Sequence, residues 1–406
     1  MRVVLFDLLI TGHHREYASF LVDHLTDSGD EVTFVTWTDD PLLEPLRKHP
    51  AVDLRFLASR DARPFARSLP QQLIQNYRGM RFALRMADHR AADAFHVLYL
   101  DRSELALFRA IRRDRGRLHT FATLFWPYFA HSDGEGVGAL KAWFHAVNRR
   151  ALRRLLSRGL LHSLFVHSAR IRDELLEALR LPSAADRVVV VPDPAHRGTA
   201  RSAEEARIRL GLPSNRALFL FFGGLRSDKG PDILLEALPM VRSPFPWSLV
   251  IAGQAGVVNQ QTIDSFRKRL CDPTCLLPRI GFVSDEDMYD YFSATDAVVL
   301  PYRRSNKGTS GILQRAAAAA KPVIATDVGD IGPTVREAGL GLLVEPESPS
   351  ALARALSDFV PDRERLQREV RPKAQRYAAE NDWRILGRRV RDSYVSQANA
   401  QTGRLR

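Results

Sequence analysis

Short apolar runs alternate with longer stretches of helical periodicity along these 406 residues, and this alternation restricts the possible folds more than any other feature. Such runs are typical of strands buried on both faces, and strands separated by helices indicate a parallel sheet with helices on each side. In the first half the predicted strands are "RVVLFDL" (2–8), "EVTFVTW" (31–37), "VDLRFLA" (52–58), "AFHVLYL" (94–100) and "LHTFATLF" (118–125), with a first helix over 15–29.

The pattern restarts after a segment rich in Ala, Arg, Ser and Pro between Pro192 and Pro213. We therefore expect an α/β protein of two domains with a cleft between them, residues 1–195 and 196–374. A helix at about 375–397 could pack back on the first domain. The predicted strands of the second half are 217–224, 247–253, 277–283, 296–302 and 321–327.

Composition excludes several classes of protein. No apolar run reaches the ~18 residues of a membrane-spanning helix, and the N-terminus is typical of a first strand and not of a secretion signal. Two cysteines, Cys271 and Cys275, are too few for a disulfide framework and indicate thiols in a reducing cytoplasm. The net charge of +12 calls for an anionic partner or substrate. Nucleic acid is not expected, because the chain lacks the interleaved aromatic residues of its binding modules.

Two loops combine glycines with positive charge where a parallel sheet binds ligands, beyond the carboxyl ends of its strands. In "FFGGLRSDKGPDILLEAL", Gly223 and Gly224 let the backbone approach an anion, and Arg226 and Lys229 can meet its charge. In "NKGTSGILQRAAAAA", residues 308–311 stand at a helix start. A plain strand-to-helix turn with solvated charges is the competing interpretation of each loop.

Five stretches in order resemble the retaining glycosyltransferases of family 4, which have the GT-B fold. They are "GGLRSDKGPDILLEA", "LVIAGQAG", "IGFVSDEDMYDYFSATDAVVLPY", "GTSGILQRAAAAAKPVIATDVG" and "GLGLLVEPESPSALARAL". The resemblance implies two Rossmann-like domains whose parallel sheets face each other across a cleft, with a nucleotide-diphosphate sugar bound mainly by the second domain. It implies no bound metal and no cofactor.

The resemblance also assigns residues. Lys229 matches the basic residue on the donor diphosphate, while the usual arginine position falls on Gly224, so that Arg226 would serve instead. Val283 matches the loop beside the nucleobase, and Gly12 matches a glycine of the acceptor-side loop. The donor-binding set implied is Gly224, Arg226, Lys229, Val283, Lys307, Gly308, Thr309, Ser310, Gly311 and Arg315.

Lys307 and Arg315 depart from the family, which has two glutamates at these positions. Carboxylates accept hydrogen bonds from sugar hydroxyls, whereas Lys and Arg only donate. A shift of one residue would place Asn306 and Gln314 there, which could still accept. Three interpretations stay open: an active transferase that holds the sugar by other groups, a donor or acceptor with extra negative charge, or a protein that binds without catalysis.

The histidine that the family often has after the strand 118–125 is absent, and Phe125 or Trp126 occupies its region. His13 and His14, at the first helix start, are the nearest substitutes and are the candidate catalytic residues. The alternative is that one of them caps or packs locally and the other is exposed.

The resemblance implies a hexosyltransferase of polysaccharide or glycoconjugate assembly that uses a glycan, lipid-linked or small-molecule acceptor. Residues 139–160 interleave arginines with leucines and are consistent with an acidic membrane surface, so we expect a cytoplasmic protein, peripheral on the inner membrane face. A core helix with a solvated arginine face is the alternative. The competing function is a degenerate GT-B protein that binds a sugar nucleotide or glycan without transfer.

Overall fold

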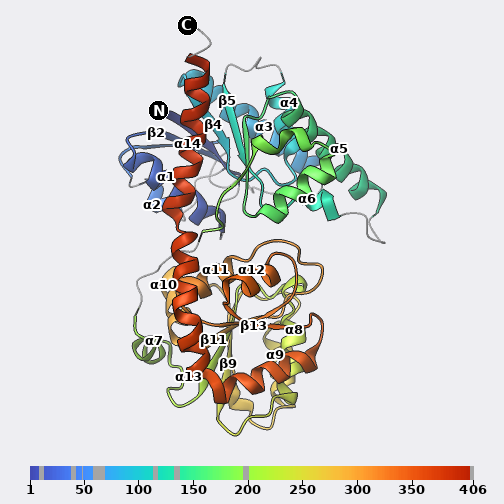
Figure 1. The fold of residues 1–406 in the computed structure, drawn as a ribbon, viewed down its shortest axis with the longest axis vertical. Helices are drawn as coiled ribbons and strands as arrows, with labels where there is room; N and C mark the ends of the chain where they lie inside the picture. The colour runs from blue at the N-terminus through green and yellow to red at the C-terminus, as the bar shows by residue number, and fades with distance from the viewer. Residues whose placement is uncertain are drawn as a thin grey trace. The chain divides into compact units, whose positions relative to one another are not determined.

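The computed structural model describes residues 1–8, 13–37, 43–47, 49–57, 69–112, 118–131, 138–194 and 201–402. The chain divides into two compact units, which we call unit 1 (Met1–Pro192 and Trp383–Arg406) and unit 2 (Asp193–Asp382). The sequence predicted boundaries at 195/196 and near 375. Helix α13 (Pro349–Glu380) runs unbroken through the second of these, so the change of unit falls at its end, just before α14 (Trp383–Thr402) (Figure 1).

Unit 1 is built on a parallel sheet of strand order β3-β2-β1-β4-β5-β6-β7 among the described residues. Alternate residues of β1 serve two cores: Val4 and Phe6 pack with α3, α4 and α5, while Val3 and Leu5 pack with α1 and α14. The strands are β1 (Arg2–Phe6), β2 (Glu31–Thr36), β3 (Val52–Phe56), β4 (Ala94–Val97), β5 (His119–Thr123), β6 (Ser163–Val166) and β7 (Val188–Val190). The α-helices are α1 (His13–Asp27), α2 (Glu44–Arg47), α3 (Leu69–His89), α4 (Glu104–Ile111), α5 (Ala139–Ser157), α6 (Ala169–Leu179) and α14.

Helix α14 returns to unit 1 and lies beside α1 (Figure 1). The ring of Trp383 stacks on Phe20 with 4.4 Å between centroids. The hydroxyl of Tyr394 lies 2.5 Å from Nδ1 of the fully buried His96. Burial lowers the pKa of His96 to about 3, so this histidine is neutral and belongs to the core.

Unit 2 repeats the architecture with strand order β10-β9-β8-β11-β12-β13. Its strands are β8 (Ala217–Phe222), β9 (Trp247–Gly253), β10 (Leu276–Ile280), β11 (Ala297–Leu300), β12 (Val323–Thr326) and β13 (Gly341–Val344). Its α-helices are α7 (Ala203–Leu210), α8 (Pro231–Ala237), α9 (Gln260–Arg267), α10 (Asp285–Ala294), α11 (Gly311–Ala318), α12 (Ile331–Ala338) and α13.

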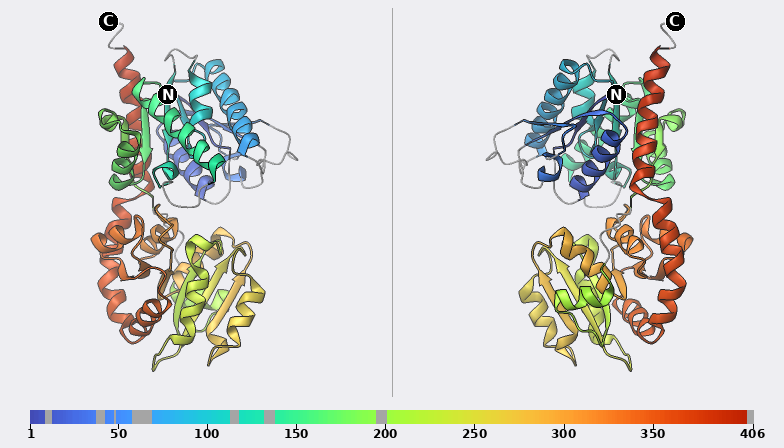
Figure 2. Two further views of the ribbon diagram at one scale, coloured as in Figure 1. Left: turned by 90° about the vertical axis from the view of Figure 1, so that its right-hand side faces the viewer. Right: turned by 90° about the vertical axis from the view of Figure 1, so that its left-hand side faces the viewer.

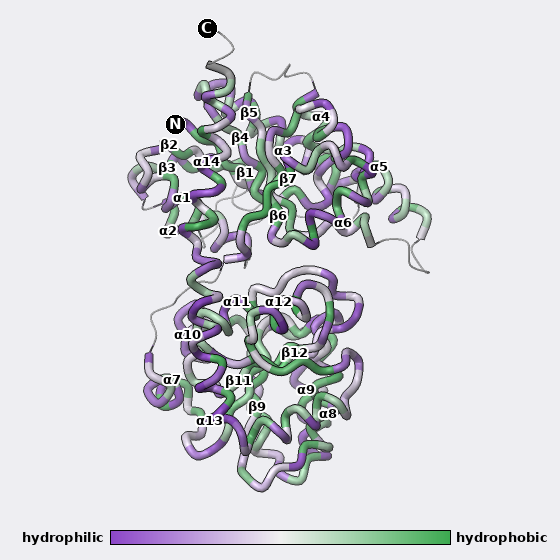
Figure 3. The backbone as a smooth tube through the Cα atoms, in the orientation of Figure 1, coloured by the Kyte–Doolittle hydropathy of each residue, from purple (hydrophilic) through white to green (hydrophobic). Residues whose placement is uncertain are grey.

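Each sheet carries helices on both faces (Figure 2), and its central strands are largely apolar (Figure 3). The predicted α/β class with two parallel sheets is confirmed. Within the described ranges, no helix has both the length and the apolar character needed to cross a bilayer.

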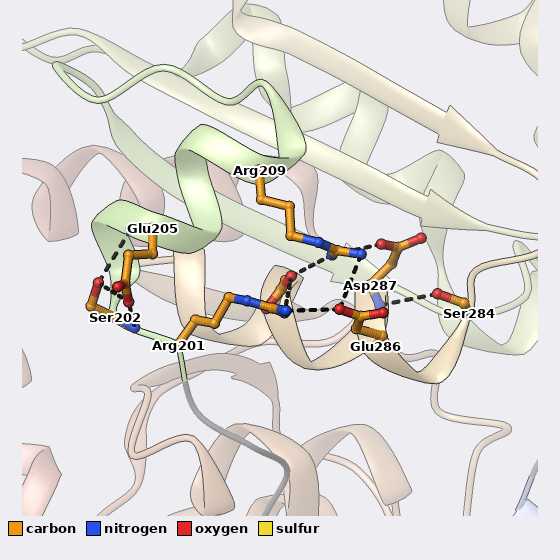
Figure 4. Close-up of polar contacts among 8 residues, drawn as sticks. Arg201, Ser202, Glu205, Arg209, Ser284, Glu286 and Asp287 are labelled. Carbon is orange, nitrogen blue, oxygen red and sulfur yellow. Dashed lines mark hydrogen bonds and ion pairs between the residues drawn. The ribbon is translucent and has the colours of Figure 1, made fainter.

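A network of ion pairs and hydrogen bonds links helix α10 to α7 (Figure 4). Asp290 has a fully buried side chain and accepts hydrogen bonds from Arg201, at 2.9 and 3.0 Å, and from Arg209. Glu286 and Asp287 extend the network at the more exposed end of the helix. The network fixes the helix that begins directly after the loop containing Val283.

Candidate functional site

The strand order of unit 2 reverses between β8 and β11, which are hydrogen-bonded neighbours. Open α/β sheets bind ligands at such a switch point, beyond the carboxyl ends of the two strands. The loops that follow β8 and β11 are the two that the sequence predicted as anion sites, so the topology brings them together.

The two loops are in direct contact. The N–H of Arg303 donates to the carbonyl of Asp228 at 3.0 Å, and its Nε donates to the carbonyl of Ser227 at 2.9 Å. Gly230 has φ of +63°, and a Cβ there would lie 2.0 Å from the carbonyl oxygen of Pro301. Only glycine fits this position, which explains the glycine after Lys229.

Lys229 lies at the centre of the two loops. A Cβ on Gly223 would lie 2.7 Å from its Nζ, so the ammonium group rests against bare backbone at the end of β8. Nζ is also 6.0 Å from the centroid of the Tyr302 ring. Burial, and then the nearby charge of Arg226, lowers the pKa of Lys229 to about 8; Asp228 opposes this and Arg315 adds to it. A cation held in such surroundings suits an anionic ligand.

Arg226 stands at the rim, with 65% of its side chain exposed. It donates to both carboxylate oxygens of Asp228, at 2.9 and 2.7 Å. The hydrogen bond from Arg226 holds the pKa of Asp228 below its usual value. To bind a diphosphate, Arg226 would have to exchange this carboxylate for the ligand.

Helix α11 points its N-terminus at this site. Ser310 is the N-cap: its hydroxyl accepts from the N–H of Leu313 at 3.3 Å and lies 3.2 Å from the hydroxyl of Tyr302. Gly308 and Thr309 precede the cap, and Gly311 is the first helical residue. Backbone N–H groups and the helix dipole favour negative charge here.

Lys307 and Arg315 flank the start of α11 and are both half-buried. Arg315 donates to the carbonyl of Gly311 at 3.2 Å, and its charge acts on Lys229 and on Tyr302. The charges of Arg226, in the same loop as Lys229, and of Arg315, in α11, therefore both act on Lys229.

The neighbours of Lys307 and Arg315 in sequence are more deeply buried. The side-chain amide of Gln314, 3% exposed, donates to the hydroxyl of Tyr377 on α13 at 3.1 Å. Asn306 is 6% exposed, and its amide lies 3.5 Å from Oδ2 of Asp228. Val283, half-buried after β10, and Phe222, at the end of β8, both pack against the core on that face of the sheet.

Unit 1 has a switch point of its own, between β1 and β4. Nδ1 of His14, in the first turn of α1, lies 2.9 Å from Oδ2 of Asp7, which directly follows β1. Burial alone would lower the pKa of His14, but the charge and hydrogen bond of Asp7, with the charge of Asp101, outweigh it and raise the pKa. Gly12 lies outside the described residues, as does the side chain of His13.

The polar residues after β4 complete this region, and sequence reasoning missed them. Asp101 accepts from the backbone N–H groups of Phe125, at 3.0 Å, and Trp126, at 2.7 Å. Glu104 is fully buried and accepts from the hydroxyl of Tyr128 at 3.1 Å. The available signal was an acidic residue at the end of a predicted apolar strand: Asp101 directly follows 94–100, and Asp7 is the last residue but one of 2–8.

Comparison with known families finds a similarity in the second half of the chain. Residues 216–362 match the family model described as Glycosyl transferases group 1. Unit 2 is therefore similar to this family over most of its length. The match includes β8, Lys229, the start of α11 and most of the other elements of unit 2.

Curated relatives point the same way over part of their length. The chain is 31% identical over 226 residues to a D-inositol 3-phosphate glycosyltransferase of Streptomyces coelicolor, covering 53% of this chain and 48% of that protein. The chain therefore aligns with about half the length of this relative.

Solved structures resemble the whole chain. Sucrose-phosphate synthase from Thermosynechococcus elongatus has a TM-score of 0.77 at 17% identity, covering 98% of this chain and 99% of that one. HepE from Anabaena in complex with UDP-glucose has a TM-score of 0.71 at 14% identity, with 98% and 100% covered. With the two parallel sheets, these likenesses show the GT-B fold that the sequence predicted.

Proposed function

We propose that this protein is a retaining glycosyltransferase of family 4 that moves a hexose from a nucleotide-diphosphate sugar to a hydroxylated acceptor. The observation that carries the proposal is the meeting of Lys229, Arg226 and Arg315 with the N-terminus of α11 at the switch point of unit 2. Positive charge from the loop after β8 and from α11 meets there with the backbone N–H groups at the start of α11, a combination suited to a diphosphate. The UDP-glucose complex of the structurally similar HepE supports a nucleotide-sugar ligand.

The chemistry asked of these residues is electrostatic. When the bond between the sugar and the diphosphate breaks, negative charge develops on the departing phosphate oxygen, and preorganised donors stabilise it. Lys229 and the amides at Gly308–Gly311 are suited to this. We propose that neither a metal nor a cofactor takes part. Loss of one such contact typically lowers turnover by about 10²–10³, which we expect for Lys229→Ala.

Lys307 and Arg315 stand where the family has glutamates, and they would have a different role in binding the donor. Because both only donate hydrogen bonds, we propose that they hold phosphate oxygens or another anionic group of the donor. Donors that carry a uronic acid or a phosphate would use the same charges. The competing function, binding without transfer, rests on the same two residues.

Helix α5 favours an acceptor at a membrane surface. Five arginines are exposed along it, and the helix also exposes 60% of Leu140 and 54% of Trp143. Positions 140, 143, 150, 154 and 158 recur at helical spacing, so the apolar and basic residues share one face. We propose that this face lies on anionic lipid at the cytoplasmic side of a membrane, with a glycan or lipid-linked acceptor of polysaccharide assembly. The exposed arginines are Arg149, Arg150, Arg153, Arg154 and Arg158.

The first experiment is a thermal-shift panel of UDP, GDP, ADP, dTDP and CMP, followed by the matching sugar nucleotides. A nucleotide at about 100 times its Kd stabilises the protein by about 2.7 kcal/mol, which is easily detected. Selective stabilisation by one nucleotide, lost in Lys229→Ala, supports the donor site. Transfer or slow hydrolysis of the matching sugar nucleotide then separates the enzyme from the binding protein. No stabilisation by any nucleotide would contradict the proposal.

A further inference from the structure

Unit 2 has a cavity at the end of its sheet opposite the basic loops. The cavity has a volume of about 410 Å³ and lies between two segments: residues 238–247, which lead into β9, and residues 270–275, which lead into β10. Strand β9 is seven residues long, so about 20 Å separates its first residue from the loop that follows its last. A ligand in this cavity would therefore occupy a site separate from the switch point.

The floor of the cavity is apolar. Leu238, Val241 and Leu270 are 2%, 7% and 8% exposed and belong to the core on this face of the sheet. Cys275, 4% exposed, belongs to the same core and also lines the cavity. Because transfer of apolar surface out of water is favourable, an apolar group bound against this floor is stabilised.

The walls are stiff and partly aromatic. Three prolines line one side, and their fixed φ angles restrict the backbone there. Trp247 is half-buried, and 53% of Phe245 is exposed beside it in the sequence only one proline away. Preformed cavities of about 300–1,000 Å³ with apolar and aromatic walls are typical of sites for small molecules. The prolines are Pro239, Pro244 and Pro246.

Arg242 supplies positive charge to the same cavity. Its Nη1 donates to the carbonyls of Pro239, at 2.7 Å, and Val241, at 3.0 Å, so the side chain is held in place. Among the residues that the structure describes, no carboxylate forms an ion pair with this guanidinium. Asp272, the acid that lines the cavity, is paired with Arg216 at 2.8 Å. A guanidinium beside apolar walls fits a ligand with an apolar body and an anionic group.

We propose that this cavity binds an amphiphilic organic acid, with its apolar body against Leu270 and Trp247 and its carboxylate or sulfonate on Arg242. The site shares no residue with the switch point, so it is independent of the proposed function. Aliphatic and aromatic acids both have this chemistry, and competition experiments distinguish them.

Cys271 provides a reporter within the site. Its thiol is exposed and lines the cavity. The other cysteine of the chain, Cys275, is buried, and burial raises its pKa to about 11, so iodoacetamide should alkylate Cys271 first. A ligand at about ten times its Kd should slow this alkylation about tenfold, because only the unoccupied protein reacts.

The test uses the full chain and anilinonaphthalene sulfonate, an aromatic anion whose fluorescence rises in apolar surroundings. We expect saturable binding that protects Cys271 from iodoacetamide. Arg242→Met should weaken this binding about three- to fivefold, the effect of one exposed ion pair, and should leave binding of the uncharged phenylnaphthylamine unchanged. Arg242→Lys should retain most of the affinity for the anion. Arg368→Met, at an exposed arginine of α13, is the matched control.

Decanoate and naphthoate then serve as competitors of the fluorescent anion. Displacement by decanoate assigns an aliphatic acid to the cavity, displacement by naphthoate assigns an aromatic one, and either result supports the inference. Displacement by neither acid overturns it.

Two further results would overturn the inference: alkylation of Cys271 at the same rate with and without the anion, or equal effects of Arg242→Met on the charged and the uncharged probe. If Arg242→Met fails to fold, protection of Cys271 in the wild-type protein still decides. Failure of the proposed function looks different, because no nucleotide would then stabilise the protein while the anion would still protect Cys271.

Discussion

Lys229 should make nucleotide affinity depend on pH in a window where few other groups near it titrate. Its pKa is about 8 in the free protein, and only the protonated amine attracts a diphosphate. Its neighbours Asp228 and Tyr302 keep one protonation state through this window. The hydrogen bond from Arg226 lowers the pKa of Asp228, so this carboxylate stays ionised, and burial raises the pKa of Tyr302 to about 12, so its phenol stays neutral.

The size of the effect follows from the titration. At pH 7 about nine-tenths of the free protein carries protonated Lys229, and at pH 9 about one-tenth does. The Kd for the nucleotide should therefore rise about tenfold between pH 7 and pH 9, equivalent to about 1.4 kcal/mol. A bound anion raises the pKa of Lys229, so the increase continues until the pKa of the complex is reached.

Isothermal titration calorimetry of the best nucleotide of the panel at pH 7, 8 and 9 measures this directly. Lys229→Met should bind more weakly at every pH, with a flat profile. Lys229→Arg provides the matched control, because a guanidinium stays charged across the range and should also give a flat profile. A wild-type Kd that does not change from pH 7 to pH 9, or an unaltered slope in Lys229→Met, would refute the placement of this lysine on the phosphates.

Three further changes test other parts of the structure. Gly223→Ala should weaken nucleotide binding in the same calorimetric assay about as much as loss of the lysine, because φ of +106° is strained for alanine and the new methyl would meet the ammonium group; unchanged affinity would separate the glycine from the site. Gly387→Ala should destabilise unit 1 by about 1–3 kcal/mol in urea unfolding, because the Cβ of the new alanine would lie 2.4 Å from Cγ of His24. An unaltered unfolding midpoint would show that α14 shifts freely. Replacing Arg154 and Arg158 by Glu should weaken flotation with anionic vesicles at least tenfold while leaving nucleotide binding unchanged, and equal flotation would remove α5 from the membrane.

Much of unit 2 could be predicted from the sequence because its strands are continuous apolar runs and its loops contain glycines. The predicted strand 217–224 contains β8 and the glycine turn that follows it, and the predicted strand "DAVVLPY" contains β11. The rule that ligands bind at the carboxyl ends of strands indicated the loops after β8 and β11 as anion sites, but the strand order that makes them neighbours was not readable. Pairing of β8 with β11 depends on long-range packing, which periodicity does not encode.

Unit 1 was less predictable at the level of the site. The sequence indicated His14 by its place after the first strand, but gave no reason to pair it with Asp7 or Tyr99. These contacts depend on the direction in which side chains point at the ends of strands, and on the pairing of β1 with β4 in the sheet. The end of α13 at Glu380 was not predicted either, because the helix continues through Pro361 and Pro372 and neither proline marks a boundary.

The two switch points differ in the charge of the residues that surround them, and this difference argues for transfer over simple binding. In unit 2 the loops supply Arg226, Lys229 and Arg315, with Asp228 already bonded to the first of these. In unit 1 the corresponding loops supply Asp7, a histidine and Asp101. A protein that only bound a sugar nucleotide would need the first set alone. A transferase needs both, because its leaving group is an anion and its nucleophile is a neutral hydroxyl that must be oriented by groups able to accept its proton in a hydrogen bond.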